Sequence, residues 1–162
     1  MVIFRVFHPF RVVVIAFCIP PFPNADDRAK VIDMNQKSIW AGCDVGSSRT
    51  KVAVLDENKK LVGYAVHKSG TDFTATAQRC LDEALAMAGR GQEDIVNAVS
   101  TGYGRKNVSY ASGTMTEIGC HAAGCFYYFP KPITIIDIGG QDNKVIKLNE
   151  QGHRLSFKMN RK

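Results

Sequence analysis

One short phrase occurs twice in this chain, and the two copies constrain its fold more than any other feature. The first copy, residues 44–51, reads Asp-Val-Gly-Ser-Ser-Arg-Thr-Lys, and the second, residues 137–144, reads Asp-Ile-Gly-Gly-Gln-Asp-Asn-Lys. The copies lie 93 residues apart, the difference between positions 44 and 137, and similar residues continue at this spacing as far as Val66 and Met159. Internal similarity of this length indicates two related supersecondary units.

Regular apolar patterns surround both copies of the phrase. Residues 39–45 form an apolar run that ends at the first glycine turn, which is typical of a buried strand. Two more apolar segments follow on either side of a polar turn at residues 56–59, and the second copy repeats this order around a turn at residues 149–152. Each unit is therefore predicted to contain three consecutive strands. The strands with the clearest bounds are residues 39–45, 51–55, 61–66, 133–137 and 155–159.

Two helices and one more strand are predicted between the two units. Apolar residues recur at helical spacing over residues 73–88, and a glycine follows them, as at many helix ends. Residues 95–100 form a short apolar strand, and residues 116–126 form a second helix with Thr114 or Thr116 as its cap. This order of elements predicts an α/β fold, a mixed sheet with flanking helices.

Charge distribution and cysteine usage argue against a nucleic-acid-binding protein and against a small protein held together by disulfides. The formal net charge is +6, so a nucleic-acid partner has to be considered. The lysines and arginines are scattered, without a basic run or interleaved aromatic residues, which indicates a solvated basic surface and no nucleic-acid partner. The five cysteines are odd in number and irregularly spaced, which indicates reduced thiols. Cys120, His121 and Cys125 lack the spacing of a metal knuckle.

The repeated phrase places residues suited to phosphate binding at one loop of each unit. Glycine lets the backbone approach a phosphate closely, serine hydroxyls donate hydrogen bonds, and lysine supplies positive charge. We expect Asp44 and Asp137 to act in catalysis and to hold a hydrated Mg²⁺, with Asp142 as a further ligand, because Mg²⁺ prefers few carboxylates together with phosphates. The residues expected to bind the cofactor ATP are Gly46, Ser47, Ser48, Lys51, Gly139, Gly140, Gln141, Asp142 and Lys144.

Two further segments are candidate parts of the same site, although a duplicated hairpin without a ligand is the alternative for the whole arrangement. Residues 101–105 follow a strand, where ligand loops of α/β proteins lie, but a plain glycine-rich loop is equally consistent. Glu117 is a candidate catalytic residue that positions a water, yet an acidic residue at a helix N-terminus also favours the helix dipole. We interpret His121 as a packed helix residue. The loop residues expected to contact ATP are Thr101, Gly102 and Gly104.

Residues 1–37 differ from the rest of the chain. An apolar stretch with interspersed basic residues leads into a proline-rich segment at residues 20–23 and then a polar run. A secretory signal peptide is one interpretation, but the cleavage context is poor and the stretch is too short to span a membrane. We expect an N-terminal extension outside the fold, no membrane partner, and a cytoplasmic location, where ATP is available.

Four short segments of the sequence, in their order along the chain, resemble the activator ATPases of 2-hydroxyacyl-CoA dehydratases. This family includes the ATPase subunits of benzoyl-CoA reductase. The resemblance covers residues 39–160. It implies two ribonuclease H-like domains of the actin, hexokinase and Hsp70 superfamily, with ATP in the cleft between them. The phrases are Gly-Cys-Asp-Val-Gly-Ser at residues 42–47, Ser-Thr-Gly-Tyr-Gly-Arg at 100–105, Thr-Glu-Ile-Gly-Cys-His-Ala at 116–122 and Ile-Ile-Asp-Ile-Gly-Gly-Gln-Asp at 135–142.

The resemblance implies a function and a set of partners. ATP hydrolysis would be coupled to low-potential electron transfer into a 2-hydroxyacyl-CoA dehydratase or aryl-CoA reductase. The family protein is a homodimer with a bridging 4Fe–4S cluster, and ferredoxin or flavodoxin is the electron donor. Residues 44–51 resemble the first phosphate loop and residues 137–144 the second. We therefore expect residues 1–37 as an extension, 38–130 as the first ribonuclease H-like domain and 131–162 as the opening strands of the second.

The end of the sequence departs from the family pattern. The family phrase Phe-x-Met-Asn continues into Cys-Ala-Ala-Gly-Thr-Gly, whereas Arg161 and Lys162 follow Asn160 here. None of the five cysteines matches a cluster position, so we expect an N-terminal portion of an activator that binds no cluster and is inactive alone. We also expect a second domain of marginal stability, because apolar residues would be left partly exposed. Those residues are Ile135, Val145, Ile146, Leu148 and Leu155.

Other functions stay open. A sugar- or acetate-kinase-like phosphotransferase would use the same ATP loops, but no sugar-binding insert stands between residues 61 and 73. A non-catalytic, decayed nucleotide-binding module is another alternative. A ribonuclease H nuclease fits less well, because two glycine loops with lysines suit a nucleotide better than a duplex.

Overall fold

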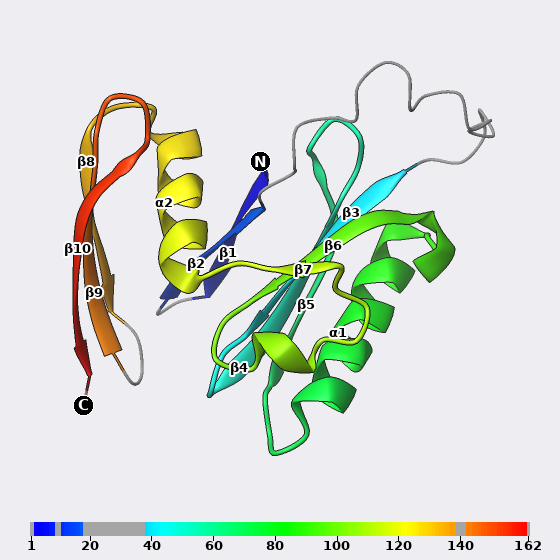
Figure 1. Ribbon diagram of the computed structural model, residues 1–162. Coiled ribbons are helices and arrows are strands. Elements are labelled where there is room, and N and C mark those ends of the chain that lie inside the picture. Colours follow the sequence, from blue (N-terminus) through cyan, green and yellow to red (C-terminus); the bar gives the residue numbers. More distant parts are fainter. Residues whose placement is uncertain (1, 9–10, 18–37, 139–141, 162) are drawn as a thin grey trace.

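The computed structural model describes residues 2–8, 11–17, 38–138 and 142–161 (Figure 1). Its larger sheet has the strand order β5-β4-β3-β6-β7. Strands β3, β4 and β5 are antiparallel, whereas β6 and β7 add in parallel, so the sheet is mixed as predicted. The bounds are β3 Ile39–Val45, β4 Arg49–Leu55, β5 Leu61–Lys68, β6 Ile95–Thr101 and β7 Gly113–Thr114.

The smaller sheet contains the second copy of the phrase and has the strand order β10-β9-β8, antiparallel throughout. A third sheet is the antiparallel pair of β1 and β2. The expectation that residues 1–37 lie outside the fold stays a prediction, and residues 18–37 lie outside the described part. The bounds are β8 Ile133–Ile138, β9 Asp142–Leu148, β10 Arg154–Arg161, β1 Val2–His8 and β2 Arg11–Phe17.

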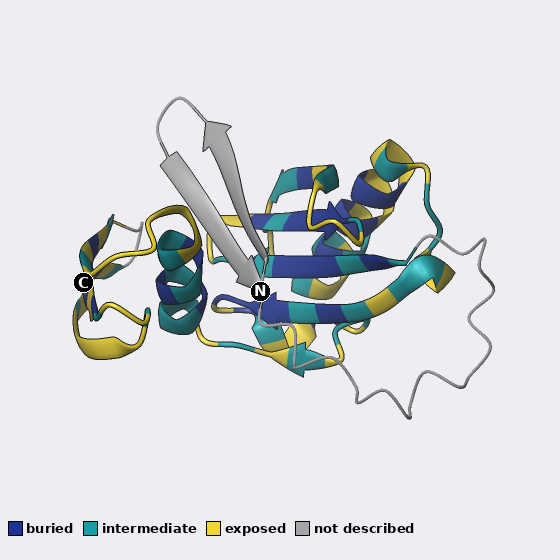
Figure 2. Ribbon diagram, turned by 90° about the horizontal axis from the view of Figure 1, so that it is seen from above, coloured by how far each residue is buried: buried dark blue, intermediate teal, exposed yellow. Residues whose placement is uncertain are grey.

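Helix α1, Phe73–Ala88, begins and ends where the sequence predicts. The Asp72 side chain accepts a hydrogen bond from the backbone N–H of Ala75, which satisfies a donor that has no partner within the helix. Gly89 ends the helix with a φ of 62°, a conformation that costs glycine little. The apolar side of α1 packs on β3, β4 and β5 and forms the main core (Figures 1 and 2).

Helix α2, Glu117–Tyr128, starts at the predicted cap, where Thr116 accepts a hydrogen bond from Gly119 N at 3.2 Å. Its apolar side packs on β8 and β9, around Ala122 and Ile146. This packing corrects one expectation, because Ile135, Ile146 and Leu148 are buried rather than partly exposed. The sequence order suggests that α2 belongs to the first domain, whereas it covers the second sheet. Val145 and Leu155 are exposed, as predicted.

The two copies of the phrase lie in hairpins with the same register. The first and last residues of β9 lie 93 positions after those of β4, for example 142 and 49. The same offset relates β10 to β5. Each pair has a β-bulge at the same place, which skips Val62 in the first copy and Leu155 in the second. The connecting turns also match, since Asp56 and Asn149 each accept two backbone hydrogen bonds through Oδ1.

Two short 3₁₀ helices complete the described structure, η2 at Gln92–Asp94 and η3 at Arg105–Asn107. Neither of them nor β7 was predicted, because segments of two or three residues carry no measurable periodicity. Among the described residues, no helix is long and apolar enough to cross a membrane.

Candidate functional site

Asp44 and Lys51 of the first copy are cross-strand partners at the end of β3 and the start of β4. Lys51 Nζ donates to Asp44 Oδ2 at 2.7 Å, and the two side chains are only 15% and 13% exposed. The other carboxylate oxygen, Asp44 Oδ1, is buried and has no hydrogen-bond partner among the described residues. A buried carboxylate oxygen without a donor is costly, so this atom marks a place for a ligand, a cation or a bound water.

Ser69, which is fully buried just after β5, holds the turn at residues 46–48 in place. Ser69 Oγ donates to the carbonyl oxygen of Gly46 at 2.6 Å and lies 3.0 Å from Thr50 Oγ1, while Ser69 N donates to Ser48 O. Ser47 and Ser48 themselves are exposed. The turn is therefore fixed through its backbone, while its two serine side chains stay accessible.

The loop at residues 101–105 lies against the first copy of the phrase. Thr101 is the parallel cross-strand partner of Asp44, and Gly104 N donates to Val45 O at 2.9 Å. Gly102 has a φ of 89°, and a Cβ atom at this position would lie 2.5 Å from Asp44 Oδ1. Only glycine therefore fits here beside the unpaired carboxylate oxygen. Thr101 Oγ1 is a second buried oxygen without a partner in the described part of the chain.

Asp137 and Lys144 of the second copy repeat the arrangement of Asp44 and Lys51. They are cross-strand partners on β8 and β9, and Lys144 Nζ lies 3.3 Å from Asp137 Oδ2. Lys144 also donates to Asp142 Oδ1 and lies 3.6 Å from Glu117 Oε2. Its side chain is only 3% exposed. Gly139, Gly140 and Gln141, which were expected to bind ATP, lie outside the described residues.

The three carboxylates around Lys144 hold its ammonium group in the charged form. Burial alone would lower the pKa of Lys144, but the hydrogen bond to Asp142 and the charges of Glu117 and Asp137 outweigh it and raise this pKa. One positive charge faces three negative ones, so the cluster retains a negative charge that suits a cation.

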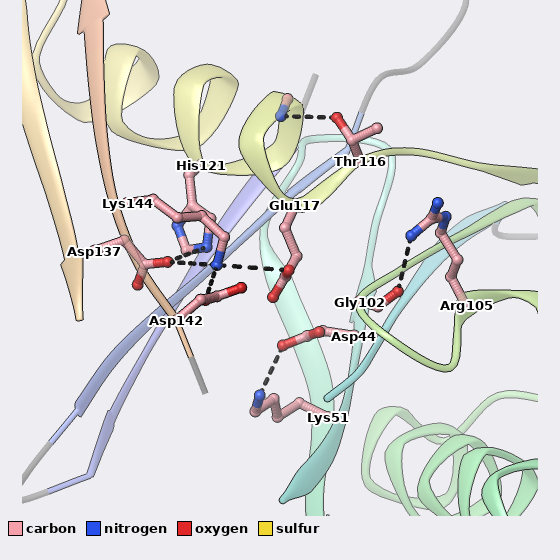
Figure 3. Close-up of polar contacts among 11 residues, drawn as sticks. Asp44, Lys51, Gly102, Arg105, Thr116, Glu117, His121, Asp137, Asp142 and Lys144 are labelled. Carbon is pink, nitrogen blue, oxygen red and sulfur yellow. Dashed lines mark hydrogen bonds and ion pairs between the residues drawn. The ribbon is translucent and has the colours of Figure 1, made fainter. Parts of the chain in front are cut away.

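Glu117 lies between the two copies of the phrase. It is the first residue of α2, and Figure 3 shows its carboxylate pointing into the space between the pair of Lys144 and Asp137 and the pair of Asp44 and Lys51. The helix cap at Thr116 fixes this position. A role for Glu117 in positioning water stays a prediction, since its contact in the structure is the ion pair with Lys144.

Two residues of this region were not among the predicted site residues. His121 Nε2 lies 3.5 Å from Asp137 Oδ2, and the histidine is one helical turn after Glu117 on the same face of α2. This i, i+4 spacing was a signal available in the sequence. Ser69 had no such signal, because a single serine after a strand is common and its contacts depend on the tertiary fold.

The donor set fits Mg²⁺ bound together with phosphate. Among the described residues, no group of three or more histidine, cysteine, aspartate or glutamate side chains is arranged to hold a metal ion. Mg²⁺ commonly keeps several waters and takes one or two carboxylates plus phosphate oxygens, which Asp44 Oδ1 and Asp137 would supply in part. The residues thus suit a metal that arrives with a nucleotide.

Residues 41–162 match the family model described as the BadF/BadG/BcrA/BcrD ATPase family. The chain belongs to this family. Among curated members of the BadF/BadG/BcrA/BcrD family, the activator of lactoyl-CoA dehydratase from Anaerotignum propionicum is 45% identical over 121 residues, 75% of this chain and 46% of the relative. The 2-hydroxyisocaproyl-CoA dehydratase activator from Clostridioides difficile is 42% identical over 121 residues, 75% of this chain and 45% of the relative. The chain thus spans about half the length of these relatives.

Solved structures of the family show the same fold. Component A of the Acidaminococcus fermentans (R)-2-hydroxyglutaryl-CoA dehydratase matches with a TM-score of 0.70 at 38% identity, over 77% of this chain and 48% of that one. The C. difficile activator with bound ADPNP also matches with a TM-score of 0.70, at 41% identity, over 76% of this chain and 46% of that one. An exopolyphosphatase from Cytophaga hutchinsonii, 12% identical with a TM-score of 0.54, shares the fold alone. The predicted actin-, hexokinase- and Hsp70-like ATPase fold is confirmed.

Proposed function

We propose that this chain supplies the phosphate-binding hairpins of an ATP-dependent activator that acts on a 2-hydroxyacyl-CoA dehydratase or an aryl-CoA reductase. The observation that carries the proposal is the pair of Asp–Lys hairpins, which share one register and flank Glu117. A relative 41% identical to this chain binds ADPNP, which supports a nucleotide as the ligand.

In this proposal each residue has a role that its position allows. Ser47 and Ser48 donate to phosphate oxygens, Gly46 and Gly104 let the two loops lie close to the phosphates, and Lys51 balances the phosphate charge. Because Gly102 has no side chain to crowd Asp44 Oδ1, this oxygen would hold a hydrated Mg²⁺. Bound Mg²⁺ would neutralise charge on the phosphates during hydrolysis.

The second hairpin and its neighbours would complete the nucleotide site. Lys144 and residues 139–141 are proposed to meet the phosphates from the other side, Asp142 to reach them through the hydrated metal, and Thr101 to line the first loop. Asp137 and Glu117 would orient the attacking water or the hydrated metal. The negative charge that surrounds Lys144 supports the metal-holding part of these assignments.

The partners of the whole assembly are part of the same proposal. The activators named above act on dehydratases, and a benzoyl-CoA reductase component from Thauera aromatica is 25% identical over 126 residues. We propose a dehydratase or reductase component as the partner, a homodimer with a bridging 4Fe–4S cluster as the active assembly, ferredoxin or flavodoxin as the electron donor, and the cytoplasm as the location. The cysteines of this chain are not proposed as cluster ligands.

Calorimetric titration of the purified chain with ADPNP and Mg²⁺ tests the proposal. We expect saturable binding that requires Mg²⁺ and that Lys51→Met and Asp44→Asn weaken at least about tenfold, the effect of losing one charge-assisted contact. Lys60→Met is the matched control, because Lys60 is exposed at the far end of the same hairpin. Absence of binding, or equal losses in Lys60→Met, would contradict the proposal.

A further inference from the structure

His121 is a largely buried imidazole beside the second copy of the phrase. It stands one helical turn after Glu117 on α2, and its Nε2 lies 3.5 Å from Asp137 Oδ2. The His121 side chain is only 18% exposed, and Figure 3 shows the ring beside Asp137 and Lys144. A polar ring so far removed from water requires a polar partner, and the carboxylate of Asp137 provides one.

Packing alone does not account for His121. The apolar contact of α2 with the smaller sheet is made around Ile118, Ala122, Cys125 and Phe126. His121 lies four residues after Glu117 and four before Cys125, so it continues the line of side chains that starts at Glu117. Cys125 adds no charge on this line, because burial and the charge of Asp137 raise the pKa of its thiol. His121 is therefore the polar side chain with which α2 reaches Asp137.

The two aspartates of the repeat are held differently. Lys51 holds Asp44 Oδ2 at 2.7 Å. Lys144 lies farther from Asp137 Oδ2, at 3.3 Å, and two further carboxylates share its ammonium group. One ammonium group divided among three carboxylates holds each of them less firmly than an undivided pair does. A second donor on Asp137 makes up this difference, and His121 reaches the same carboxylate oxygen.

The positions of the two donors restrict the carboxylate of Asp137. One donor comes from β9 and the other from α2, and both reach Oδ2. Together they oppose rotation of the carboxylate, so its other oxygen, Oδ1, keeps one direction. In the first copy the equivalent oxygen, Asp44 Oδ1, is the one that marks a place for a ligand. The contact needs no charge on His121, because a neutral imidazole with its proton on Nε2 donates in the same way.

We propose that His121 is a positioning residue, which donates its Nε2–H to Asp137 Oδ2 and thereby orients Asp137 toward the hydrated Mg²⁺ of a bound nucleotide. This inference rests on the proposed function and adds the residue that holds the second aspartate. The separation of 3.5 Å is longer than an ordinary N–H···O hydrogen bond, and we expect it to shorten when the nucleotide binds, as contacts in such sites commonly do. Loss of a group that hydrogen-bonds to a metal-binding side chain typically weakens metal affinity about 10- to 100-fold.

Calorimetric titration of the full chain with ADPNP and Mg²⁺ tests this role in matched variants. His121→Leu removes the donor and is expected to weaken binding at least about tenfold, whereas His121→Gln keeps an N–H at a similar position and should stay within about threefold of the wild type. His67→Leu is the control, because His67 Nε2 also meets a carboxylate, that of Glu83 at 2.7 Å, where β5 faces α1. Equal losses in His121→Leu and His67→Leu, or in His121→Leu and His121→Gln, would overturn the proposal. Circular dichroism checks that each variant is folded, and His121→Ala replaces the leucine variant if that one unfolds.

A double-mutant cycle separates positioning from a general effect on the fold. Because His121 acts through Asp137, the change His121→Leu should cost less than about threefold in an Asp137→Ala background. In an Asp44→Asn background it should still cost about tenfold, since Asp44 is held by Lys51. Equal costs in the two backgrounds would show that His121 does not act through Asp137. If the wild type fails to bind ADPNP with Mg²⁺, the proposed function and this inference are both wrong; if it binds and the cycle shows no coupling, this inference alone is wrong.

Discussion

Lys51 and Asp44 face each other across β3 and β4, with Lys51 Nζ 2.7 Å from Asp44 Oδ2. The same relationship recurs between Lys144 and Asp137 across β8 and β9. The spacing of seven residues between aspartate and lysine is what a tight hairpin needs to place them opposite each other. Each lysine is therefore held in place by its aspartate.

Loss of the lysine charge should destabilise the fold as well as weaken nucleotide binding. Lys51→Met leaves the carboxylate of Asp44 largely buried without its ion pair, and we expect a loss of about 1–3 kcal/mol in the free energy of unfolding. Urea titration followed by circular dichroism measures this. Lys60→Met should stay within about 0.5 kcal/mol of the wild type, as surface substitutions usually do. A stable Lys51→Met variant would show that the ion pair contributes little.

Gly102 is expected to tolerate no side chain. Its φ of 89°, and the 2.5 Å that would separate a Cβ atom from Asp44 Oδ1, predict that Gly102→Ala costs about 1–3 kcal/mol of stability and displaces the loop from the site. Thermal unfolding and ADPNP titration measure the two effects. Gly113→Ala is the control, because nothing lies within 4 Å of a Cβ atom there. Similar results for both variants would argue against a special position for Gly102.

Ser69 is predicted to position the turn at residues 46–48. Ser69→Ala removes the donor to Gly46 O and leaves Thr50 Oγ1 without its buried partner, so we expect a loss of about 1–3 kcal/mol in stability. Hydrogen exchange of residues 46–48 should become faster, whereas Ser109→Ala, at an exposed serine, should change neither quantity. Unchanged exchange in Ser69→Ala would mean that other contacts fix the turn.

Stability should fall in alkaline solution because of buried thiols. Burial raises the pKa of Cys43 from its ordinary 9.0 to about 12, so folding protects the neutral thiol. Its contribution is complete below pH 9 and is lost as the pH rises from 9 toward 12, because the unfolded chain releases the proton first. Between pH 9.5 and 10.5, Cys43→Ala should reduce the fall in unfolding free energy by about 1.4 kcal/mol per pH unit. Equal pH slopes in the two proteins would contradict the burial of a neutral thiol.

The turn between β4 and β5 offers a stabilising change. Lys59 has a φ of 64°, and the equivalent residue of the second hairpin is Gly152, with a φ of 77°. A non-glycine residue in this conformation costs roughly 1–2 kcal/mol, partly offset by the greater freedom of glycine in the unfolded chain, about 0.4–1 kcal/mol. Lys59→Gly should therefore raise stability by up to about 1 kcal/mol, as measured by urea titration. Asn58→Gly, at a position without positive φ, should lower it.

The sequence predicts elements well where local chemistry decides them. Helix α1 has both of its ends set by neighbours in the chain, the cap at Asp72 and the left-handed Gly89, so its bounds are confirmed. The repeat likewise predicts matching hairpins, because register follows from strand and turn length. The placement of α2 against the second sheet could not be predicted this way, since an amphipathic helix does not indicate which sheet receives it. The same holds for Ser69, whose partners lie 19 and 23 residues away in the chain.

The bulge that skips Val62 in one hairpin and Leu155 in the other has a consequence for engineering. Strand lengths, turn and bulge coincide, so residues 49–68 and 142–161 are interchangeable parts with respect to the backbone. A chimera carrying either hairpin twice would keep every cross-strand partner. Whatever distinguishes these two hairpins is therefore determined by their side chains, which can be exchanged one position at a time.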